Sequence, residues 1–151
     1  MLNGTDWQTT HPEFIGDAQR LLNRCQECFA HLQLIADDRD ALECLLDSLS
    51  RLSQLAAHAR IGCMAELCKD MRQLLDIAST NQRLNDETLA VLEQCLTLLA
   101  WQLELIDLRT GLLPLDDGEQ TWLLEQLAAT CEPDNRQHTP VPDLAVAQAP
   151  G

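Results

Sequence analysis

Apolar residues recur along this chain in steps of three and four, the spacing that places them on one face of an α-helix. Four such stripes follow one another, and each predicts one long helix. The stripes are Phe14, Ala18, Leu21, Cys25, Cys28, Leu32 and Ile35; Leu42, Leu45, Leu49, Leu52 and Ala56; Met64, Leu67, Met71, Leu74 and Ala78; and Leu92, Cys95, Leu99, Gln102 and Ile106. Long helices with short connections pack as antiparallel neighbours. The pattern therefore predicts an all-α fold, an antiparallel four-helix bundle with an additional C-terminal helix. We expect Leu21, Leu45, Leu49, Leu67, Leu74, Leu92 and Leu99 in its core.

Local signals mark where these helices begin and end. The stretch Thr10–Glu13 has the spacing of a capping box, so the first helix is expected to open there. Carboxylates in Asp37–Asp40 are expected at the start of the second helix, where the helix dipole favours them. Gly62 predicts a break after the second helix, Asn85 the start of the fourth, and Gly111 its C-terminal cap.

The end of the chain predicts a shorter helix and then a segment of different composition. The fifth helix is expected from Asp117 to about Cys131. Prolines interrupt polar and small residues beyond it, which predicts a disordered tail. We therefore divide the chain into an N-terminal extension over residues 1–11, the helical bundle with its fifth helix over 12–131, and the tail over 132–151.

Composition and charge narrow the classes of partner. Leu and Ala dominate the apolar residues and only 3% of residues are aromatic, which argues against a sheet protein. The net charge of −14 argues against binding to nucleic acid or to an anionic membrane surface. No apolar run is long enough to insert into a membrane. The polar N-terminus does not resemble a secretory signal, so we expect a cytoplasmic protein.

The seven cysteines lie within helical patterns, and their number is odd. We interpret them as free thiols packed in the core of a protein from a reducing compartment. Cys25, Cys28 and His31 place three possible metal ligands on one helix face, but they coincide with or border the apolar stripe. We predict no metal site and no cofactor.

The residues also predict no catalytic site. His11, His58 and His138 have no partners spaced for nucleophilic catalysis, and the six glycines form no phosphate-binding loop. Glu66 and Asp70 lie four apart on the third helix and fit a solvated pair better than an acid–base dyad. We therefore expect a protein that binds other proteins and is not an enzyme.

The order of elements in residues 14–109 is similar to that of a known family. A long first helix, an acidic turn at Asp37-Asp38, a third helix reading Met64–Asp76 and a fourth opening at Leu84–Thr88 follow one another. This region resembles a histidine-containing phosphotransfer domain, most closely the N-terminal domain of chemotaxis-type histidine kinases. The resemblance implies bacterial two-component signalling, with a response-regulator receiver domain or a histidine kinase as partner.

The motif of that family is His-x-x-Lys-Gly in the middle of the second helix. There the histidine carries the phosphoryl group, the lysine supplies positive charge, and the glycine lets the receiver domain approach. Alignment of the third helix without gaps places Ser50 at the histidine, Ser53 at the lysine and Gln54 at the glycine. A serine hydroxyl needs an activating base, and none is evident beside Ser50. This register implies a degenerate domain that keeps the docking surface and lacks the phosphoacceptor.

A competing register uses the stretch His58–Gly62, which keeps a histidine, a basic residue and a glycine. The basic residue then stands one place early, and only five residues separate His58 from Met64. The rest of the acceptor helix and its loop would have to be missing, so we favour Ser50.

The leading hypothesis is a non-catalytic phosphotransfer-like protein that acts as a scaffold, a sequestering agent or an inhibitor. Its positive residues would complement the acidic pocket of a receiver domain. The expected partner-binding residues are Arg51, Ser53, Gln54, His58, Arg60, Lys69 and Arg72, around the pseudo-phosphoacceptor position Ser50. Two alternatives are an active phosphorelay intermediate using His58 or Ser50, and a helical adaptor unrelated to phosphorelay.

Overall fold

The computed structural model describes residues 6–80 and 84–131. Across these two ranges the chain forms helices and no strand, so the predicted all-α class is confirmed. None of these helices combines the length and the hydropathy that a membrane crossing needs. The helices are α1 (Trp7–Thr10), α2 (Phe14–Leu34), α3 (Arg39–His58), α4 (Gly62–Thr80), α5 (Asp86–Leu105) and α6 (Gly118–Cys131).

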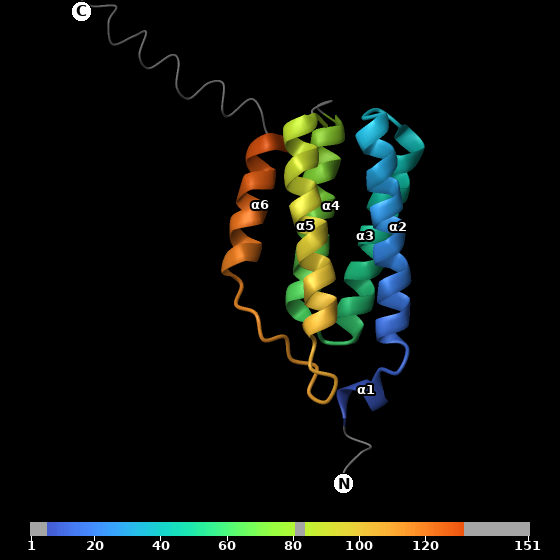
Figure 1. The fold of residues 1–151 in the computed structure, drawn as a ribbon, viewed down its shortest axis with the longest axis vertical. Helices are drawn as coiled ribbons and strands as arrows, with labels where there is room; N and C mark the ends of the chain where they lie inside the picture. The colour runs from blue at the N-terminus through green and yellow to red at the C-terminus, as the bar shows by residue number, and fades with distance from the viewer. Residues whose placement is uncertain (1–5, 81–83, 132–151) are drawn as a thin grey trace, which may run out of the picture.

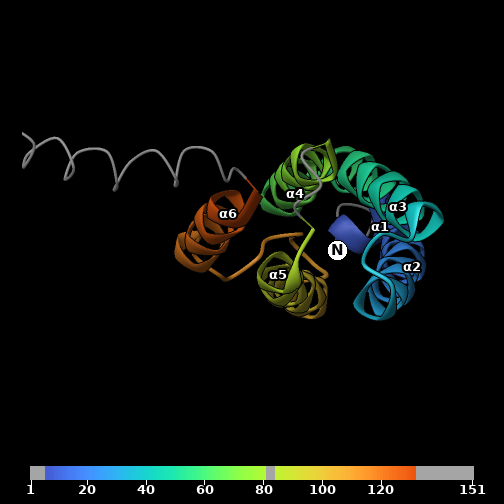
Figure 2. The same ribbon diagram turned by 90° about the horizontal axis from the view of Figure 1, so that it is seen from above.

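The helices α2, α3, α4 and α5 run alternately up and down, so that neighbours in the chain are antiparallel (Figure 1). Helix α2 packs against α3 on one side and α5 on the other, and α3 packs against α4. Helix α6 lies against both α4 and α5 (Figure 2). Since α4 and α5 touch each other less than each touches α6, the last helix completes the bundle on that side.

The core follows the predicted stripes with a local shift in α2 and α4. Most of the expected core leucines are buried, but Leu21 and Leu74 are only half-buried. Their neighbours Leu22 and Leu75 take the inner positions. A helix with two packing neighbours buries a wider face than one strict stripe, so the adjacent position is also drawn inward. The largest fully buried side chains are Leu22, Leu32, Leu45, Leu49, Leu52, Met64, Leu67, Met71, Leu75, Leu92, Leu99 and Leu123.

The helix starts were predicted correctly where a side chain caps them. The Asp38 carboxylate accepts from the backbone N–H of Ala41, and Asn85 caps α5 in the same way. The predicted capping box at Thr10–Glu13 is wrong. Thr10 ends the short α1 and its hydroxyl donates to the carbonyl of Asp6, while α2 starts at Phe14 without a side-chain cap.

The turn between α3 and α4 is a Schellman motif built on Arg60. The backbone N–H of Ile61 donates to Ala56 O at 2.8 Å, and that of Arg60 donates to Ala57 O at 3.1 Å. Arg60 has a φ of 66°, a left-handed conformation that usually requires glycine. The buried side chain of Ile61 is the apolar contact that stabilises such a motif. The predicted break at Gly62 is therefore wrong, because Gly62 is the first residue of α4.

Helix α1 lies at the end of the bundle where the α3–α4 turn is found (Figure 1). Trp7 is buried, and its indole Nε1 donates to the carbonyl of Ala59 at 2.7 Å. The backbone N–H of Trp7 donates to Arg109 O in the loop after α5. The predicted N-terminal extension over 1–11 therefore contains a core residue. The predicted tail over 132–151 lies outside the described residues.

A buried pair of glutamines connects α6 to the rest of the bundle. Gln102 Nε2 on α5 donates to Gln120 Oε1 on α6 at 2.8 Å. Gln120 Nε2 in turn donates to the carbonyl of Cys63 in the first turn of α4 at 3.1 Å. Gln120 thus links α5 to α4, because it accepts from the Gln102 amide and donates to Cys63 O, while the side-chain oxygen of Gln102 has no hydrogen-bond partner.

Replacing Gln120 by alanine is expected to lower the free energy of unfolding by about 1–3 kcal/mol, because a buried donor of Gln102 loses its acceptor. Chemical denaturation followed by circular dichroism measures this change. Gln126→Ala, at an exposed position of the same helix, is the control and should change stability by less than about 0.5 kcal/mol. Equal effects of the two substitutions would contradict a structural role for the relay.

Candidate functional site

The position aligned with the phosphoacceptor lies in the middle of the seam between α3 and α4. Two hydrogen bonds fix the register of these antiparallel helices. The hydroxyl of Ser53 donates to Ala65 O at 2.9 Å, and toward the other end Arg39 Nη1 donates to Ser79 Oγ at 3.3 Å. Ser50 precedes Ser53 by one helical turn and is half-buried. It therefore faces the α4 side of α3 and not the helix α2.

Two cations of α4 lie on the flank that faces Ser50, Lys69 at the level of Ser50 and Arg72 one turn further along the helix. Lys69 and Arg72 follow Ala65 by four and seven residues, so they share its flank of the helix, and both are exposed. Because the helices are antiparallel and Ser53 is opposite Ala65, Ser50 is level with the turn that carries Lys69. We call Ser50, Ser53, Lys69 and Arg72 the α3–α4 flank.

The remaining predicted residues of α3 point to the other neighbour. Arg51, Gln54 and His58 are exposed and line a groove of about 530 Å³ between α2 and α3. Arg20 and Arg24 line the same groove from α2. We call this set the α2–α3 groove. The predicted partner-binding residues are therefore divided between two faces, and Arg60 stands apart from both in the turn after α3.

Two ion pairs neutralise part of the positive charge of the groove. Arg51 Nε lies 3.0 Å from the carboxylate of Asp47, and Arg20 pairs with Asp17. Each pair lies within a single helix, one in α2 and one in α3, and is exposed to solvent, so each contributes little to stability. The carboxylate of Asp47, three residues before Ser50, is thereby directed to Arg51 and is not a base for the Ser50 hydroxyl.

Sequence reasoning missed Arg20 and Arg24 as groove residues. They are spaced four apart beside the apolar stripe of α2, so a common face could be predicted. Their proximity to Arg51 depends on which flank of α2 meets α3, and the stripe alone does not give this. Their contribution makes the groove the second cationic surface of an otherwise acidic chain.

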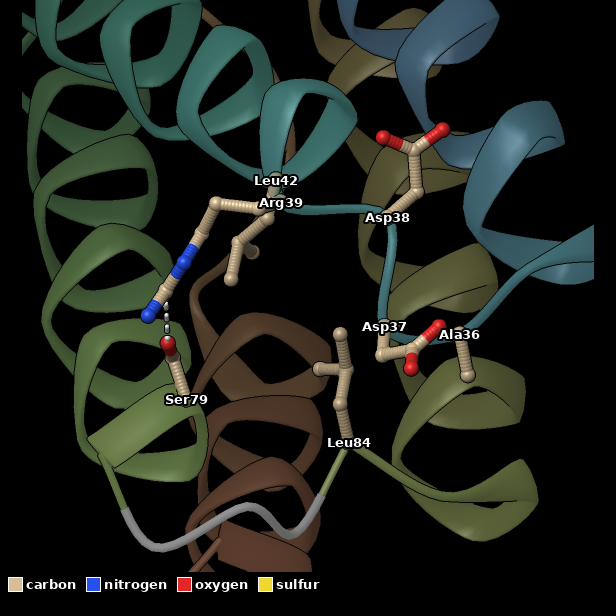
Figure 3. Close-up of a pocket in the computed structure, with 7 residues that line it drawn as sticks. All are labelled: Ala36, Asp37, Asp38, Arg39, Leu42, Ser79 and Leu84. Carbon is tan, nitrogen blue, oxygen red and sulfur yellow. Dashed lines mark hydrogen bonds between the residues drawn. The ribbon is translucent and has the colours of Figure 1, made fainter.

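Another hollow, of about 500 Å³, lies at the end of the bundle opposite α1 (Figure 3). The dashed line in the figure is the hydrogen bond from Arg39 to Ser79, and the carboxylates of Asp37 and Asp38 point away from Arg39. The Asp38 carboxylate caps α3 by accepting a hydrogen bond from the backbone N–H of Ala41. The polar groups at this end therefore serve local structure and do not converge on a common point.

The α5–α6 side carries exposed apolar residues. Trp101 on α5 and Trp122 on α6 are 57% and 52% exposed. Trp101 lines a groove of about 650 Å³ together with Leu98 and Leu115, and Glu93 and Glu119 also border it. This surface differs in chemistry from the two cationic faces.

The seven cysteines are free in the structure, and five of them are buried. Burial raises the pKa of Cys25 and of Cys95 to about 12, which fits inert core thiols. Cys25 and Cys28 are buried whereas His31 is exposed, so the possible metal ligands of α2 do not share one surface. Within the ranges that the structure describes, no three His, Cys, Asp or Glu side chains are grouped as metal ligands.

Comparison of this chain with protein-family models, with curated proteins and with solved structures finds no match in any of the three. The phosphotransfer resemblance therefore depends on the helix order and on the residues described above.

Proposed function

We propose that this chain is a non-catalytic, phosphotransfer-like signalling protein that binds a receiver domain or a histidine kinase. The observation that carries the proposal is the α3–α4 flank. In the proposed alignment Ser50 takes the position of the family's phosphoacceptor. It is half-buried, and the cations Lys69 and Arg72 lie on the facing flank of α4. The positive charge that would attract a receiver domain is present on this flank, while a hydroxyl replaces the imidazole that would accept a phosphoryl group.

Serine at this position argues against phosphoryl transfer. A serine hydroxyl attacks an aspartyl phosphate only when a base takes its proton. The nearest carboxylate along α3, Asp47, pairs with Arg51. A domain that binds a receiver and accepts no phosphate competes with the true acceptor, so sequestration, scaffolding or inhibition is the role that fits.

The distribution of charge on α4 supports the same face. Lys69 and Arg72 share the flank of Ala65, whereas Glu66 and Asp70 follow Cys63 on the flank toward α6. Burial raises the pKa of Asp70, and the neighbouring Glu66 raises it further. Asp76, four residues after Arg72, shares this flank, so it carries two positive charges and one negative, and its net positive charge would attract an acidic receiver pocket to the α3 side.

Charge reversal tests this docking face. Arg72→Glu and Lys69→Glu are each expected to weaken binding of a receiver domain by roughly tenfold at low salt, because complementary rim charge is replaced by repulsion. Isothermal titration against the purified receiver domains of the source organism measures the change. Ser50→Ala should leave affinity unaltered. Arg109→Glu, an exposed cation beside α1, is the matched control and should also have no effect.

Phosphotransfer is tested with a radiolabelled phosphoreceiver, and no label is expected on this chain. Acid-labile label lost in a His58→Gln variant would instead establish an active relay. That alternative is supported by the exposure of His58 and by its place in the cationic α2–α3 groove. Acid-stable label on Ser50 would contradict the non-catalytic proposal in the same way.

A different outcome would indicate an adaptor unrelated to phosphorelay. In that case the charge reversals would leave affinity unchanged, and Trp101→Ala or Trp122→Ala would abolish binding of the partner. The apolar α5–α6 side would then be the binding surface, and the phosphotransfer resemblance would describe the fold alone.

A further inference from the structure

A small cluster of sulfur and polar groups lies between α2 and α3. Arg24 Nε on α2 donates to Cys44 Sγ on α3 at 3.2 Å. Cys28 follows Arg24 by four residues, so it lies on the same flank of α2 as the guanidinium that contacts Cys44, and the two thiols influence each other's pKa. Cys44 is half-buried, so solvent reaches it, while Cys28 is buried behind it. Two cysteines from adjacent helices and one arginine thus lie in the same small cluster.

Ser48 adds an unusual feature to this cluster. It is fully buried, and its hydroxyl makes no hydrogen bond of ordinary geometry. It lies one turn after Cys44 on α3 and therefore on the same flank of that helix. A buried donor without an acceptor is costly. Ionisation of Cys44 would supply the acceptor that the Ser48 hydroxyl lacks.

The electrostatics of Cys44 differ from those of the other thiols. Burial raises its pKa, but the hydrogen bonds from Cys28 and Arg24 outweigh burial, and the net pKa lies below the ordinary value. The other half-buried cysteine, Cys63, has its pKa raised, first by burial, with Asp117 acting in the same direction. A solvent-accessible thiol in a positive environment is the kind that reacts as a nucleophile.

We propose that Cys44 is a hydroperoxide-reactive thiol and that Cys28 is its resolving partner, which makes the α2–α3 seam an oxidation site. In the first step the Cys44 thiolate attacks one oxygen of hydrogen peroxide. The S–O bond forms as the O–O bond breaks, and the departing hydroxide takes a proton and leaves as water. The sulfur is oxidised by two electrons to a sulfenic acid, and the peroxide is reduced.

In the second step the sulfur of Cys28 attacks the sulfur of Cys44. Burial raises the pKa of Cys28 to about 12, so this cysteine reacts as the thiol and loses its proton as the S–S bond forms. The S–S bond forms as the S–O bond breaks, and the hydroxide leaves with the thiol proton of Cys28 as water. One peroxide is consumed and two thiols are converted into one disulfide. The product joins α2 to α3, and reduction by an external dithiol restores both thiols. This site is independent of the proposed docking face.

Competition between the two half-buried cysteines tests the site in the unmodified protein. The reduced full chain is exposed to limiting iodoacetamide, and peptides are quantified by mass spectrometry. Cys44 is expected to be alkylated roughly tenfold faster than Cys63, because its thiolate fraction is larger. Stoichiometric hydrogen peroxide should then produce an intramolecular Cys28–Cys44 disulfide. Equal alkylation rates, or a disulfide between another pair, would overturn the proposal.

Variants separate the roles of the three side chains. In Cys28→Ser the reaction should stop at a Cys44 sulfenic acid that dimedone traps. Arg24→Gln should slow alkylation of Cys44 by roughly three- to tenfold, since the cation beside the sulfur is lost. Arg20→Gln removes an exposed cation one turn earlier, paired with Asp17, and is the matched control. If both arginine variants had the same effect, Arg24 would not be activating the thiol.

Discussion

Replacing Trp7 by alanine is expected to lower the free energy of unfolding by about 3–5 kcal/mol, the range for removal of a large aromatic side chain from a core. Trp7 is only 8% exposed although it lies in a helix of four residues near the start of the chain. Its ring meets that of Phe14 edge to face, with centroids 5.5 Å apart. The substitution would leave a cavity at the end of the bundle that α1 closes.

Hydrogen bonding adds to this loss. The indole Nε1 of Trp7 donates to Ala59 O, which lies at the C-terminal end of α3. An acceptor that loses its buried donor costs about 1–3 kcal/mol, less where water can enter. Without the ring, the α3–α4 turn would also lose one of its neighbours, so local opening of this end is expected.

The chain contains a matched control for this substitution. Trp122 on α6 is 52% exposed, and Trp122→Ala should change stability by less than about 1 kcal/mol. Urea denaturation followed by circular dichroism at the helical bands compares the variants without relying on indole fluorescence. A loss below about 1 kcal/mol for Trp7→Ala would show that α1 is not part of the cooperative unit.

The helices and their order could be predicted because their signals are local. Leucine stripes at helical spacing identify α2 to α5, and Asp38 and Asn85 cap helices through hydrogen bonds to residues three positions later. The burial of Trp7 had no such signal. Its partner Ala59 is 52 positions away, and only the packed bundle brings the two together.

The residue that forms the turn after α3 also could not be predicted from local sequence. Gly62 was predicted as the break after α3 on composition, yet Arg60 is the residue in the left-handed conformation. The Schellman motif is stabilised by the burial of Ile61 against the core. Which residue bends the chain is therefore decided by tertiary packing, which outweighed the local preference for glycine.

The candidate site was predicted as one surface and is found as two. Ser50 and Arg51 are about 100° apart around a helix, so they cannot face the same neighbour equally. Periodicity gives that angle, but it does not say that α4 flanks Ser50 and α2 flanks Arg51. The environment of Cys44 was missed for the same reason, because Arg24 belongs to another helix, 20 positions earlier.

Gly111→Ala is expected to be among the most destabilising single changes in the described part of the chain. Gly111 has a φ of 74°, where an L-residue costs about 1–2 kcal/mol. An added Cβ would also lie 2.3 Å from the nearest ring carbon of Trp7, a separation that real Cβ atoms do not show. The ring cannot yield freely, because its Nε1 is hydrogen-bonded to Ala59 O and the ring packs on Phe14.

The expected loss for Gly111→Ala is therefore about 3–5 kcal/mol, backbone strain together with displacement of a core aromatic. Gly62→Ala is the matched control. An added Cβ there meets nothing within 4 Å, and alanine in a helix is favoured over glycine by about 0.5–1 kcal/mol. The control should thus be neutral or stabilising in the same denaturation experiment.

If the clash with the ring is the main cause, Gly111→Ala in a Trp7→Ala background should cost only the strain of its backbone, about 1–2 kcal/mol. Full additivity of the two substitutions would contradict the contact between Gly111 and Trp7.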